Sequence, residues 1–561
     1  MGNHFQPKLL STLKSYTKQQ FYADLMAGII VGIVALPLAI AFGIASGVTP
    51  EKGIFTAIIA GFIISFLGGS KVQIGGPTGA FIVIVYGIVQ QFGVAGLAIA
   101  TMIAGVMLIL MGVFKLGTVI KFIPYPVVVG FTSGIALTIF ATQIKDLFGM
   151  QIEKVPADFI SKWITYGQHI DSVNFWSLGV GILSIIIIAI TPRFSKKIPG
   201  SLIAIVVITV IVYFLREKFG IKGIETIGDR FKIEASLPSA VAPRITFATI
   251  QLLLPTAFTI AMLGAIESLL SATVADGVIG DKHNSNTELI AQGIANIITP
   301  IFGGIPATGA IARTMTNINN GGRTPIAGII HAVVLGLILL FLGGLTKHIP
   351  MACLAGVLVI VSYNMSEWRT FKGLLKNAKS DVAVLISTFA LTVIFDLSIA
   401  IEIGLLMAAV LFIRRISETS SISIFKEEVH RADFVEGGSD TEKLHLPTGV
   451  EVYEIEGPFF FGVANKFEET MKVIGDRSRV QIIRMRKVPF MDSTGAHNLK
   501  NLIQSSQKDK VQVLLSGVNE NVYAVLKKNG IVELLGTSNV CSNIDEALKR
   551  AEEIVKTPKM R

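Results

Sequence analysis

Long apolar stretches that almost no charge interrupts decide what this chain can fold into. From residue 21 to residue 142 only six side chains are charged, and the blocks between them approach the roughly 20 residues that a helix needs to cross a bilayer. The whole chain of 561 residues follows this trend, with 51% hydrophobic and only 16% charged residues, more apolar than ordinary soluble domains. The sequence therefore predicts a polytopic α-helical membrane protein.

Fourteen segments are predicted to lie in the membrane. They cover residues 24–46, 52–68, 75–90, 94–114, 123–142, 174–191, 199–215, 251–275, 288–302, 306–318, 325–345, 349–365, 382–395 and 398–413. With the N-terminus inside, the short loops on the same side carry much of the Lys and Arg, as the positive-inside rule requires. We therefore expect a multi-pass protein of the inner (plasma) membrane with both termini cytoplasmic. The formal charge of +10 then fits loops that face anionic membrane lipid and requires no nucleic acid as a partner.

Two of these segments contain the same break, rich in glycine and proline. The break reads GGPTGA at residues 75–80 and GGIPATGA at residues 303–310. A helix broken inside a bilayer exposes N–H groups that must face protein, water or a bound solute, because lipid offers no hydrogen-bond partner. Paired breaks in two halves of a chain indicate a duplicated transporter with its binding site between the breaks. The alternative is two packing helices that glycine has softened.

The residues after each break predict a site for an anion. The substrate-binding residues expected there are Thr78, Gly79, Ala80, Thr308, Gly309 and Ala310. Each helix N-terminus carries roughly +0.5 of an elementary charge and several free N–H donors, so two of them aimed at one point attract an anion. The threonines add hydroxyl donors, and the glycines let a solute approach the backbone closely.

Two charged residues stand deep in apolar blocks, Arg313 soon after the second break and Glu267 in an earlier segment. An ionised side chain near the bilayer centre costs on the order of 2.5 to 3.5 kcal/mol, so each of them requires a partner or a function. One interpretation is that they pair as a structural bridge. The other is that Arg313 joins the anion site while Glu267 takes up a proton together with the substrate.

The composition changes after residue 415, where a soluble part begins. We expect a cytoplasmic tail at 1–20, a membrane domain at 21–415, a polar linker at 416–446 and an α/β domain at 447–561. Within the last domain, strands are predicted at 450–455, 480–485 and 511–515, and helices at 464–474, 495–504 and 520–528. Asp492 or Ser493 is expected to cap the helix that starts there.

Several other kinds of chemistry find no support in the sequence. The two cysteines, Cys353 and Cys541, supply neither a disulfide framework nor a metal site. No nucleotide-binding loop of the Gly-x-x-x-x-Gly-Lys-Ser/Thr type and no catalytic constellation is present. We therefore expect no enzyme, no cofactor and no metal, and energy for transport that comes from an ion gradient or from exchange.

These motifs together resemble the SulP anion transporter family, whose members end in a STAS domain. The resemblance rests on Pro37 within 24–47, the break at 77–79, the ESLL run at 267–270, residues 296–313, GGRT at 321–324 and DSTG at 492–495. It implies fourteen segments in two inverted repeats of seven, which form a core and a gate domain. The third and tenth segments are then half-helices that face the substrate.

The resemblance also implies a function. Members carry sulfate, C4-dicarboxylates or bicarbonate by secondary active transport with alternating access, coupled to H⁺ or Na⁺. A channel, or an exchanger without cation coupling, is the alternative. Relatives are often homodimers, so a homodimer is expected here.

Further residues take roles from the resemblance. Arg313 stands where the family has a positive residue beside the anion, and Leu38 and Phe42 are expected to line the pocket. In the sodium-bicarbonate members an aspartate at the position of Glu267 helps to hold Na⁺, with a hydroxyl four positions later, which here is Ser271. The longer glutamate, in GAIESLL at 264–270, is closer to the proton-linked dicarboxylate members.

The STAS domain has a possible regulatory position in the same motif. Thr494 corresponds to a hydroxyl that is phosphorylated in some related anti-sigma-factor antagonists, and Ser493 is adjacent to it. A phosphate at a helix N-terminus changes the charge of the surface around it. A helix cap on a regulatory or dimer-contact domain is the alternative.

Overall fold

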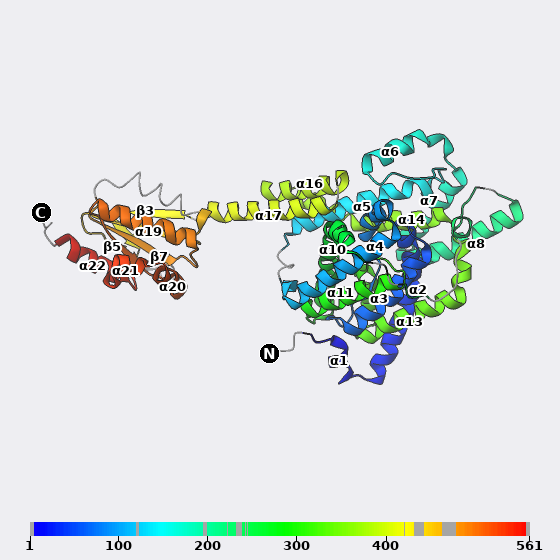
Figure 1. Ribbon diagram of the computed structural model, residues 1–561, viewed down its shortest axis with the longest axis horizontal. Coiled ribbons are helices and arrows are strands. Elements are labelled where there is room, and N and C mark those ends of the chain that lie inside the picture. Colours follow the sequence, from blue (N-terminus) through cyan, green and yellow to red (C-terminus); the bar gives the residue numbers. More distant parts are fainter. Residues whose placement is uncertain are drawn as a thin grey trace. The chain divides into compact units, whose positions relative to one another are not determined.

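Helices form nearly all of the first of two units in the computed structural model, residues 1–408, and a mixed sheet forms the centre of the second, residues 409–561 (Figure 1). The structure describes residues 5–118, 123–194, 199–221, 223–231, 238–241, 243, 245–395, 397–419, 421–430, 443–462 and 478–556. Among these residues, eight helices are long and apolar enough to cross a membrane.

The helices of the first unit account for each predicted segment. They are α1 (Lys8–Leu13), α2 (Lys18–Ala45), α3 (Pro50–Leu67), α4 (Phe81–Val113), α5 (Tyr125–Leu147), α6 (Phe159–Gln168), α7 (Phe175–Phe194), α8 (Gly200–Phe219), α9 (Ile227–Arg230), α10 (Phe247–Ile279), α11 (Ser285–Ile301), α12 (Ile311–Asn319), α13 (Pro325–Leu342), α14 (Met351–Met365), α15 (Trp368–Leu374), α16 (Lys379–Ile394) and α17 (Leu397–Thr419), which continues into the second unit. The predicted segments 75–90 and 94–114 share α4, which is interrupted at Gly93, where φ is 69°. The predicted fold class is confirmed.

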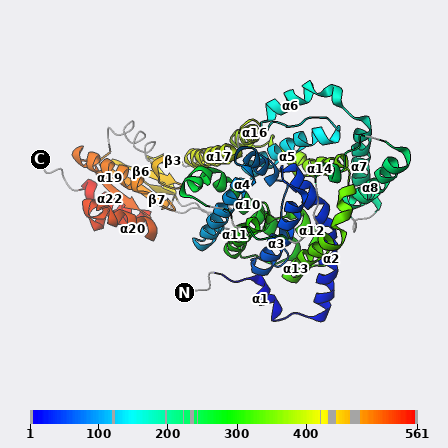
Figure 2. The ribbon, with the colours of Figure 1, turned by 45° about the vertical axis from the view of Figure 1, so that its right-hand side comes forward.

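The packing of these helices follows an inverted repeat. In the first group, α13 packs against α2 and α3 in the way that α4 packs against α10 and α11. In the second group, α16 packs against α5 in the way that α7 packs against α14. We call the first group, with α12, the core helices, and the second group, with α8, the gate helices. Figures 1 and 2 show the core helices bundled together, with α7 and α8 at the edge of the unit.

Small residues allow the core helices to approach closely. A Cβ added at Gly105 on α4 would stand 2.6 Å from the carbonyl oxygen of Gly293 on α11, and a Cβ at Gly293 would stand 2.5 Å from that of Gly105. Membrane helices gain most of their association energy from such close van der Waals packing, because lipid supplies no hydrophobic drive. The contact therefore fixes α4 against α11 and holds the region of the first break in place.

The second unit contains a five-stranded sheet in the order β3-β6-β7-β8-β9. Its strands are β3 (Ser421–Phe425), β6 (Val450–Glu456), β7 (Val480–Lys487), β8 (Gln512–Ser516) and β9 (Val540–Cys541), and only β3 runs antiparallel to its neighbour. The helices are α19 (Ser493–Lys508), α20 (Glu520–Lys528), α21 (Ile531–Leu535) and α22 (Ile544–Lys556). Apolar clusters lie on both sheet faces, one shared with α19, α20 and α21 and the other with α22. The predicted helix at 464–474 lies outside the described residues.

Part of the predicted linker at 416–446 is a strand. Residues 421–425 form β3 and pair with β6, from Ser421 opposite Glu456 to Phe425 opposite Val452. The sequence SISIF alternates polar and apolar residues with the period of a strand, and Ile422 and Ile424 pack against the sheet core. The alternating stretch is short and charged residues surround it, so the sequence pattern alone indicated a linker rather than a strand. Two further short strands, β4 (Glu428–His430) and β5 (Lys443–His445), pair with each other.

Candidate functional site

The two breaks meet face to face. Their extended residues form β1 (Gly75–Gly76) and β2 (Thr308–Gly309), an antiparallel pair in which Gly75 lies opposite Gly309 and Gly76 opposite Thr308. Next to this pair, the amide of Ala310 donates a hydrogen bond to the carbonyl oxygen of Ile74 at 2.9 Å. The pairing satisfies backbone groups that lipid could not.

We call the place where the two breaks meet, with β1 and β2, the crossing. Two helices start from it. Helix α4 begins at Phe81 and helix α12 at Ile311, and neither has a side-chain cap at its N-terminus. The first N–H groups of a helix have no partner within the helix, and the helix dipole adds partial positive charge there. Two uncapped N-termini at one crossing therefore create a positive potential that attracts an anion, even though the backbone itself carries no net charge.

Arg313 ties the crossing together. Its side chain is 2% exposed, and its Nη2 donates a hydrogen bond to the carbonyl oxygen of Pro77 at 2.7 Å. Its Nη1 is buried and has no hydrogen-bond partner among the described residues. A Cβ added at Gly76, where φ is +152°, would stand 2.1 Å from Nη1, so the guanidinium fits only against a glycine. A full positive charge is thus held beside the two helix starts.

Glu267 lies at the same crossing but has a different partner from the one that the structural-bridge interpretation requires. Its Oε2 accepts a hydrogen bond from Thr78 Oγ1 at 2.7 Å. Among the described residues it forms no ion pair with Arg313, whose Nη2 instead donates to the carbonyl oxygen of Pro77, the residue before Thr78. Thr78 and Glu267 are half-buried whereas Pro77 and Gly79 are buried. The Thr78–Glu267 pair therefore faces the accessible side of the crossing.

The other predicted hydroxyls are occupied. Thr308 is fully buried and donates to the carbonyl oxygen of Gly264 on α10 at 2.8 Å. Ser271 donates to Thr314 Oγ1 at 3.5 Å. In this state neither hydroxyl is a free donor, because a buried hydroxyl in a dry interior takes a nearby carbonyl or hydroxyl as its acceptor. The threonine hydroxyls predicted to bind substrate instead bind protein here, Thr78 included.

The predicted wall of the pocket comes from α2. Pro37 stands inside a continuous helix, with Leu38 half-buried and Phe42 buried after it. A Cβ added at Gly79 would lie 3.7 Å from Cε1 of Phe42 and 2.9 Å from Sδ of Met365 on α14. At the second break, a Cβ added at Gly309 would instead meet the side chain of Gln73, 1.8 Å from its Nε2. The first break therefore lies against the gate helices.

Glu288 is a residue that sequence reasoning missed. It is fully buried on α11, and its carboxylate accepts hydrogen bonds from the amides of Gly69 (2.8 Å) and Ser70 (3.2 Å). It also accepts from Nε2 of Gln73 (3.0 Å) and Nε2 of Gln292 (2.9 Å). Because Gln73 packs against Gly309, this carboxylate fixes the approach to both breaks. The available signal was a carboxylate at the start of an apolar segment.

Removing this carboxylate should destabilise the membrane unit. In Glu288→Ala five donors, the four above and the hydroxyl of Ser268, lose their buried acceptor. We therefore expect the free energy of unfolding to fall by about 3 to 5 kcal/mol. The thermal unfolding midpoint of the purified chain measures this. Glu402→Ala, which removes an exposed carboxylate from α17, is the matched control. Equal midpoints for the two variants would contradict this role of Glu288.

The motif of the second unit shows one cap and two exposed hydroxyls. Asp492 caps α19 and accepts a hydrogen bond from the amide of Gly495 at 2.6 Å. Ser493 and Thr494 occupy the first turn and are exposed. Cys353 and Cys541 are buried free thiols, and no group of three or more His, Cys, Asp or Glu side chains within the described ranges could hold a metal ion.

Comparison with known proteins places this geometry in a family. Residues 21–388 match the sulfate permease family, and residues 444–547 match the STAS domain. The putative sulfate transporter YvdB of Bacillus subtilis is 41% identical over 95% of this chain and 98% of its own. The bicarbonate transporter BicA of a Picosynechococcus strain is 31% identical over 94% of each chain. Both relatives are named as transporters rather than enzymes.

Solved structures show the same architecture. The transmembrane domain of a cyanobacterial bicarbonate transporter BicA superposes with a TM-score of 0.62 at 31% identity, over 70% of this chain and 98% of that domain. The murine Solute Carrier 26 family member A9 in its inward-facing state superposes with a TM-score of 0.85, over 97% of this chain and 94% of that one. At 20% identity this second likeness shows the fold alone.

Proposed function

The chain belongs to the sulfate permease family and ends in a STAS domain, and we propose that it is a secondary active transporter of a small anion. The cargo is sulfate, a C4-dicarboxylate or bicarbonate. Transport proceeds by alternating access, in which the core helices move against the gate helices around a site between the two breaks. The protein works as a homodimer in the inner (plasma) membrane, with both termini and the STAS domain in the cytoplasm.

One observation carries this proposal: two uncapped helix starts are joined by β1 and β2, with a buried arginine beside them. Each helix N-terminus contributes roughly +0.5 of an elementary charge, so together with Arg313 the crossing carries about +2. The predicted binding residues are the backbone and side chains of Thr78, Gly79, Ala80, Thr308, Gly309 and Ala310, with Arg313, Leu38 and Phe42 around them. An anion bound there would balance the positive charge of the helix N-termini and Arg313, which lipid and apolar side chains cannot do.

Uptake into proteoliposomes tests this function. The full chain is reconstituted, and labelled sulfate, succinate and bicarbonate are offered in turn, each with an imposed proton or sodium gradient. Saturable accumulation of one anion against its own gradient is the expected result. Flux that only ever runs downhill would indicate a channel, and flux that requires a second anion on the other side would indicate an exchanger without cation coupling.

Glu267 is proposed as the coupling residue, with Ser271 one turn later on α10. Ionised Glu267 would lower the charge of the crossing from about +2 to about +1, so its protonation suits a dianion. The hydrogen bond from Thr78 links the carboxyl group to the first break, so a change of protonation is felt where the substrate binds. Sodium held by Glu267 and Ser271 is the alternative.

Replacing Glu267 with Gln should flatten the pH dependence of uptake. The amide cannot bind or release a proton, so uptake should lose its rise toward acidic pH while remaining saturable. Uptake measured from pH 5.5 to 8 with a fixed membrane potential checks this. Glu402→Gln, at an exposed position, is the control. A pH profile identical to that of the wild type would exclude Glu267 as the proton-coupling residue.

The STAS domain is proposed to regulate transport. Ser493 and Thr494 are exposed at the start of α19, so a kinase could reach both. A phosphate there would add negative charge next to the N-terminus of α19. The partial positive charge of that N-terminus would stabilise the phosphate.

A further inference from the structure

A cavity of about 220 Å³ lies between core and gate helices, away from the two breaks. Its core wall is the C-terminal end of α2 together with Tyr86 and Gln90 on α4. Its gate wall is the C-terminal end of α5, Lys162 on α6 and the N-terminal turns of α14. Tyr86 stands five positions after Phe81, the first residue of α4, and five residues of helix span about 7.5 Å. The cavity therefore lies along α4 from the candidate site, toward the side that the proposed orientation makes external.

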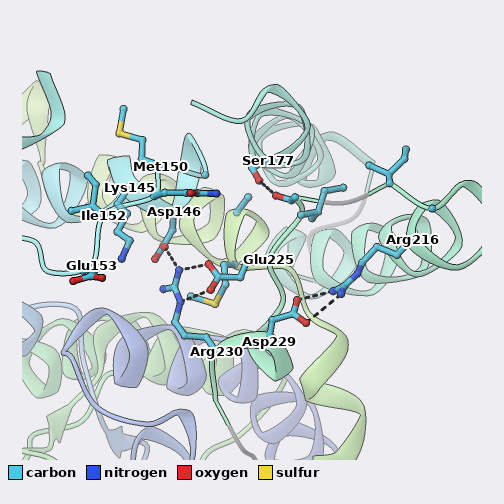
Figure 3. A pocket seen from close by; sticks show the side chains of 18 of the residues that line it. Lys145, Asp146, Met150, Ile152, Glu153, Ser177, Arg216, Glu225, Asp229 and Arg230 are labelled. Atoms are coloured by element: carbon cyan, nitrogen blue, oxygen red, sulfur yellow. Dashed lines mark hydrogen bonds and ion pairs between the residues drawn. The ribbon is translucent and has the colours of Figure 1, made fainter. Parts of the chain in front are cut away.

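A larger neighbouring cavity of about 860 Å³ shares four charged residues with this one, Lys145, Asp146, Glu153 and Arg230 (Figure 3). Most charges in its wall neutralise one another. Arg230 pairs with Asp146 at 2.8 Å and also with Glu225, and Arg216 pairs with Asp229 at 2.7 Å. These pairs fix the positions of the charged groups. The positive charge of Arg230 is already neutralised by two carboxylates and does not attract an anionic ligand.

Two lysines in the smaller cavity have no such partner. Lys162 is 1% exposed, and its ammonium has neither a hydrogen bond nor an ion pair among the described residues. The centroid of the Tyr86 ring lies 6.0 Å from Nζ, and the carboxylate of Asp158, four positions earlier, attracts the ammonium without contacting it. Lys145, half-buried at the end of α5, also forms no ion pair in the described part of the chain. Carboxylates lie near both lysines but form no ion pair or hydrogen bond with either, so an anion that contacts the two ammonium groups directly would stabilise them.

Among the residues that line the smaller cavity, basic side chains outnumber acidic ones. The basic residues are Lys145, Lys154, Lys162 and Arg230, and the acidic residues are Asp146 and Glu153. Arg230 pairs with Asp146 and with Glu225 behind this wall, and Glu153 and Lys154 are both exposed and oppositely charged. Lys145 and Lys162 are thus the partly or fully buried cations of this wall that form no ion pair with a described residue.

We propose that this cavity is a second anion-binding site, in which Lys162 and Lys145 bind a dianion such as sulfate or a dicarboxylate on its way to the crossing. Two ammonium groups match two negative charges, so a monoanion binds more weakly. Tyr86 and the amide of Gln90 complete the polar wall. The role as an outer station on the transport path rests on the proposed function, whereas binding itself is independent of it.

Trp163 provides a readout that does not depend on transport. It follows Lys162 on α6 and lies 5.9 Å from the ring of Tyr166. The chain has three tryptophans, so replacing Trp176 and Trp368 with Phe leaves Trp163 as the single reporter. Sulfate is titrated into this full-length variant at constant ionic strength, and bicarbonate is titrated for comparison. We expect a saturable change in fluorescence, with sulfate binding more tightly than bicarbonate.

Variants in the same background separate this site from the crossing. Lys162→Met should raise the half-saturating sulfate concentration roughly tenfold, the effect of losing one charge-assisted contact. Lys162→Arg should retain most of the binding. Lys218→Gln removes an exposed lysine that lines neither cavity and should change nothing. Arg313→Gln should leave this titration intact while lowering uptake by roughly a hundredfold or more.

Identical titrations for Lys162→Met and Lys218→Gln, or no saturable change in the parent, would overturn the second site. A saturable titration in a chain that transports none of the three anions would instead overturn the proposed function and leave the second site standing.

The pH dependence of this binding provides a further test. Burial lowers the pKa of Lys162 from its usual 10.5 to about 8. The titratable and charged groups around it are Asp158 on α6, Tyr86 on α4, Lys145 and Asp146 on α5, Glu153 and Lys154 before α6, Tyr166 on α6, and Arg230. Lysine carries its charge below its pKa, so sulfate binding should weaken between pH 7 and pH 9 in the parent. The same rise in pH should have little effect in Lys162→Arg. Equal weakening in both would contradict the role of Lys162.

Discussion

Replacing Arg313 with Gln is expected to lower the kcat/KM of anion uptake by roughly a hundredfold or more, because the substrate would lose a desolvated positive charge beside it. Arg313 is 2% exposed, its Nη2 donates to the Pro77 carbonyl, and its Nη1 has no partner among the described residues. Glutamine can still donate one hydrogen bond to that carbonyl, so the two breaks stay connected while the charge is lost. Uptake into proteoliposomes at several substrate concentrations measures the effect.

The control for this variant is a second arginine in the same region. Arg323 also donates to backbone carbonyls, those of Ile318 and Gly322, both at 2.8 Å, but it is exposed and lies beyond the C-terminal end of α12. Arg323→Gln should keep uptake within about twofold of the wild type, since exposed charges contribute little. Thermal unfolding of both variants shows whether folding is preserved. A folded Arg313→Gln protein with normal uptake would remove Arg313 from the anion site.

Gly76→Ala should reduce uptake by roughly tenfold to a hundredfold, even though it adds a single methyl group. Its backbone has a φ of +152°, which costs other residues about 1 to 3 kcal/mol, and its Cβ would stand 2.1 Å from Arg313 Nη1. The guanidinium must move, and its bond to Pro77 is then lost. Initial uptake rates at a subsaturating anion concentration measure the loss.

Gly87→Ala is the matched control for this prediction. It lies on α4, the helix that follows the first break, and a Cβ there has nothing within 4 Å. Alanine is also the better helix former, so this variant should be as stable as the wild type or more so. If Gly76→Ala transported as fast as Gly87→Ala, the tight fit of Arg313 against the first break would have no part in function.

The fold could be predicted in detail because a bilayer restricts the possible structures. Apolar runs of the length of a span had to be helices, and the break at 75–80 had to be satisfied by protein. The structure adds that the predicted segments 75–90 and 94–114 meet at Gly93, where non-helical backbone interrupts α4. Strand β3 could not be predicted with the same certainty, since five alternating residues are too few to outweigh the charged sequence around them.

The candidate site was predictable in its residue types and less so in its contacts. Glycine, proline and an isolated arginine mark the two breaks in the sequence, but the partner of Arg313 depends on three-dimensional geometry. The carbonyl of Pro77 holds it, and Glu267 instead accepts from Thr78. Glu288 was missed because its carboxylate is satisfied by donors from a different segment, at residues 69, 70 and 73. The order of residues in a sequence does not show hydrogen bonds between segments so far apart along the chain.

The central claim is that the transported anion binds where α4 and α12 begin, and a structure of the full chain with that anion bound tests it most directly. The account predicts density for the anion within hydrogen-bonding distance of backbone amides in residues 78–80 and 308–311, on the side of the crossing that Thr78 and Glu267 face. Density for the anion at another place between the core and gate helices, with the two helix starts vacant under conditions that support uptake, would contradict it.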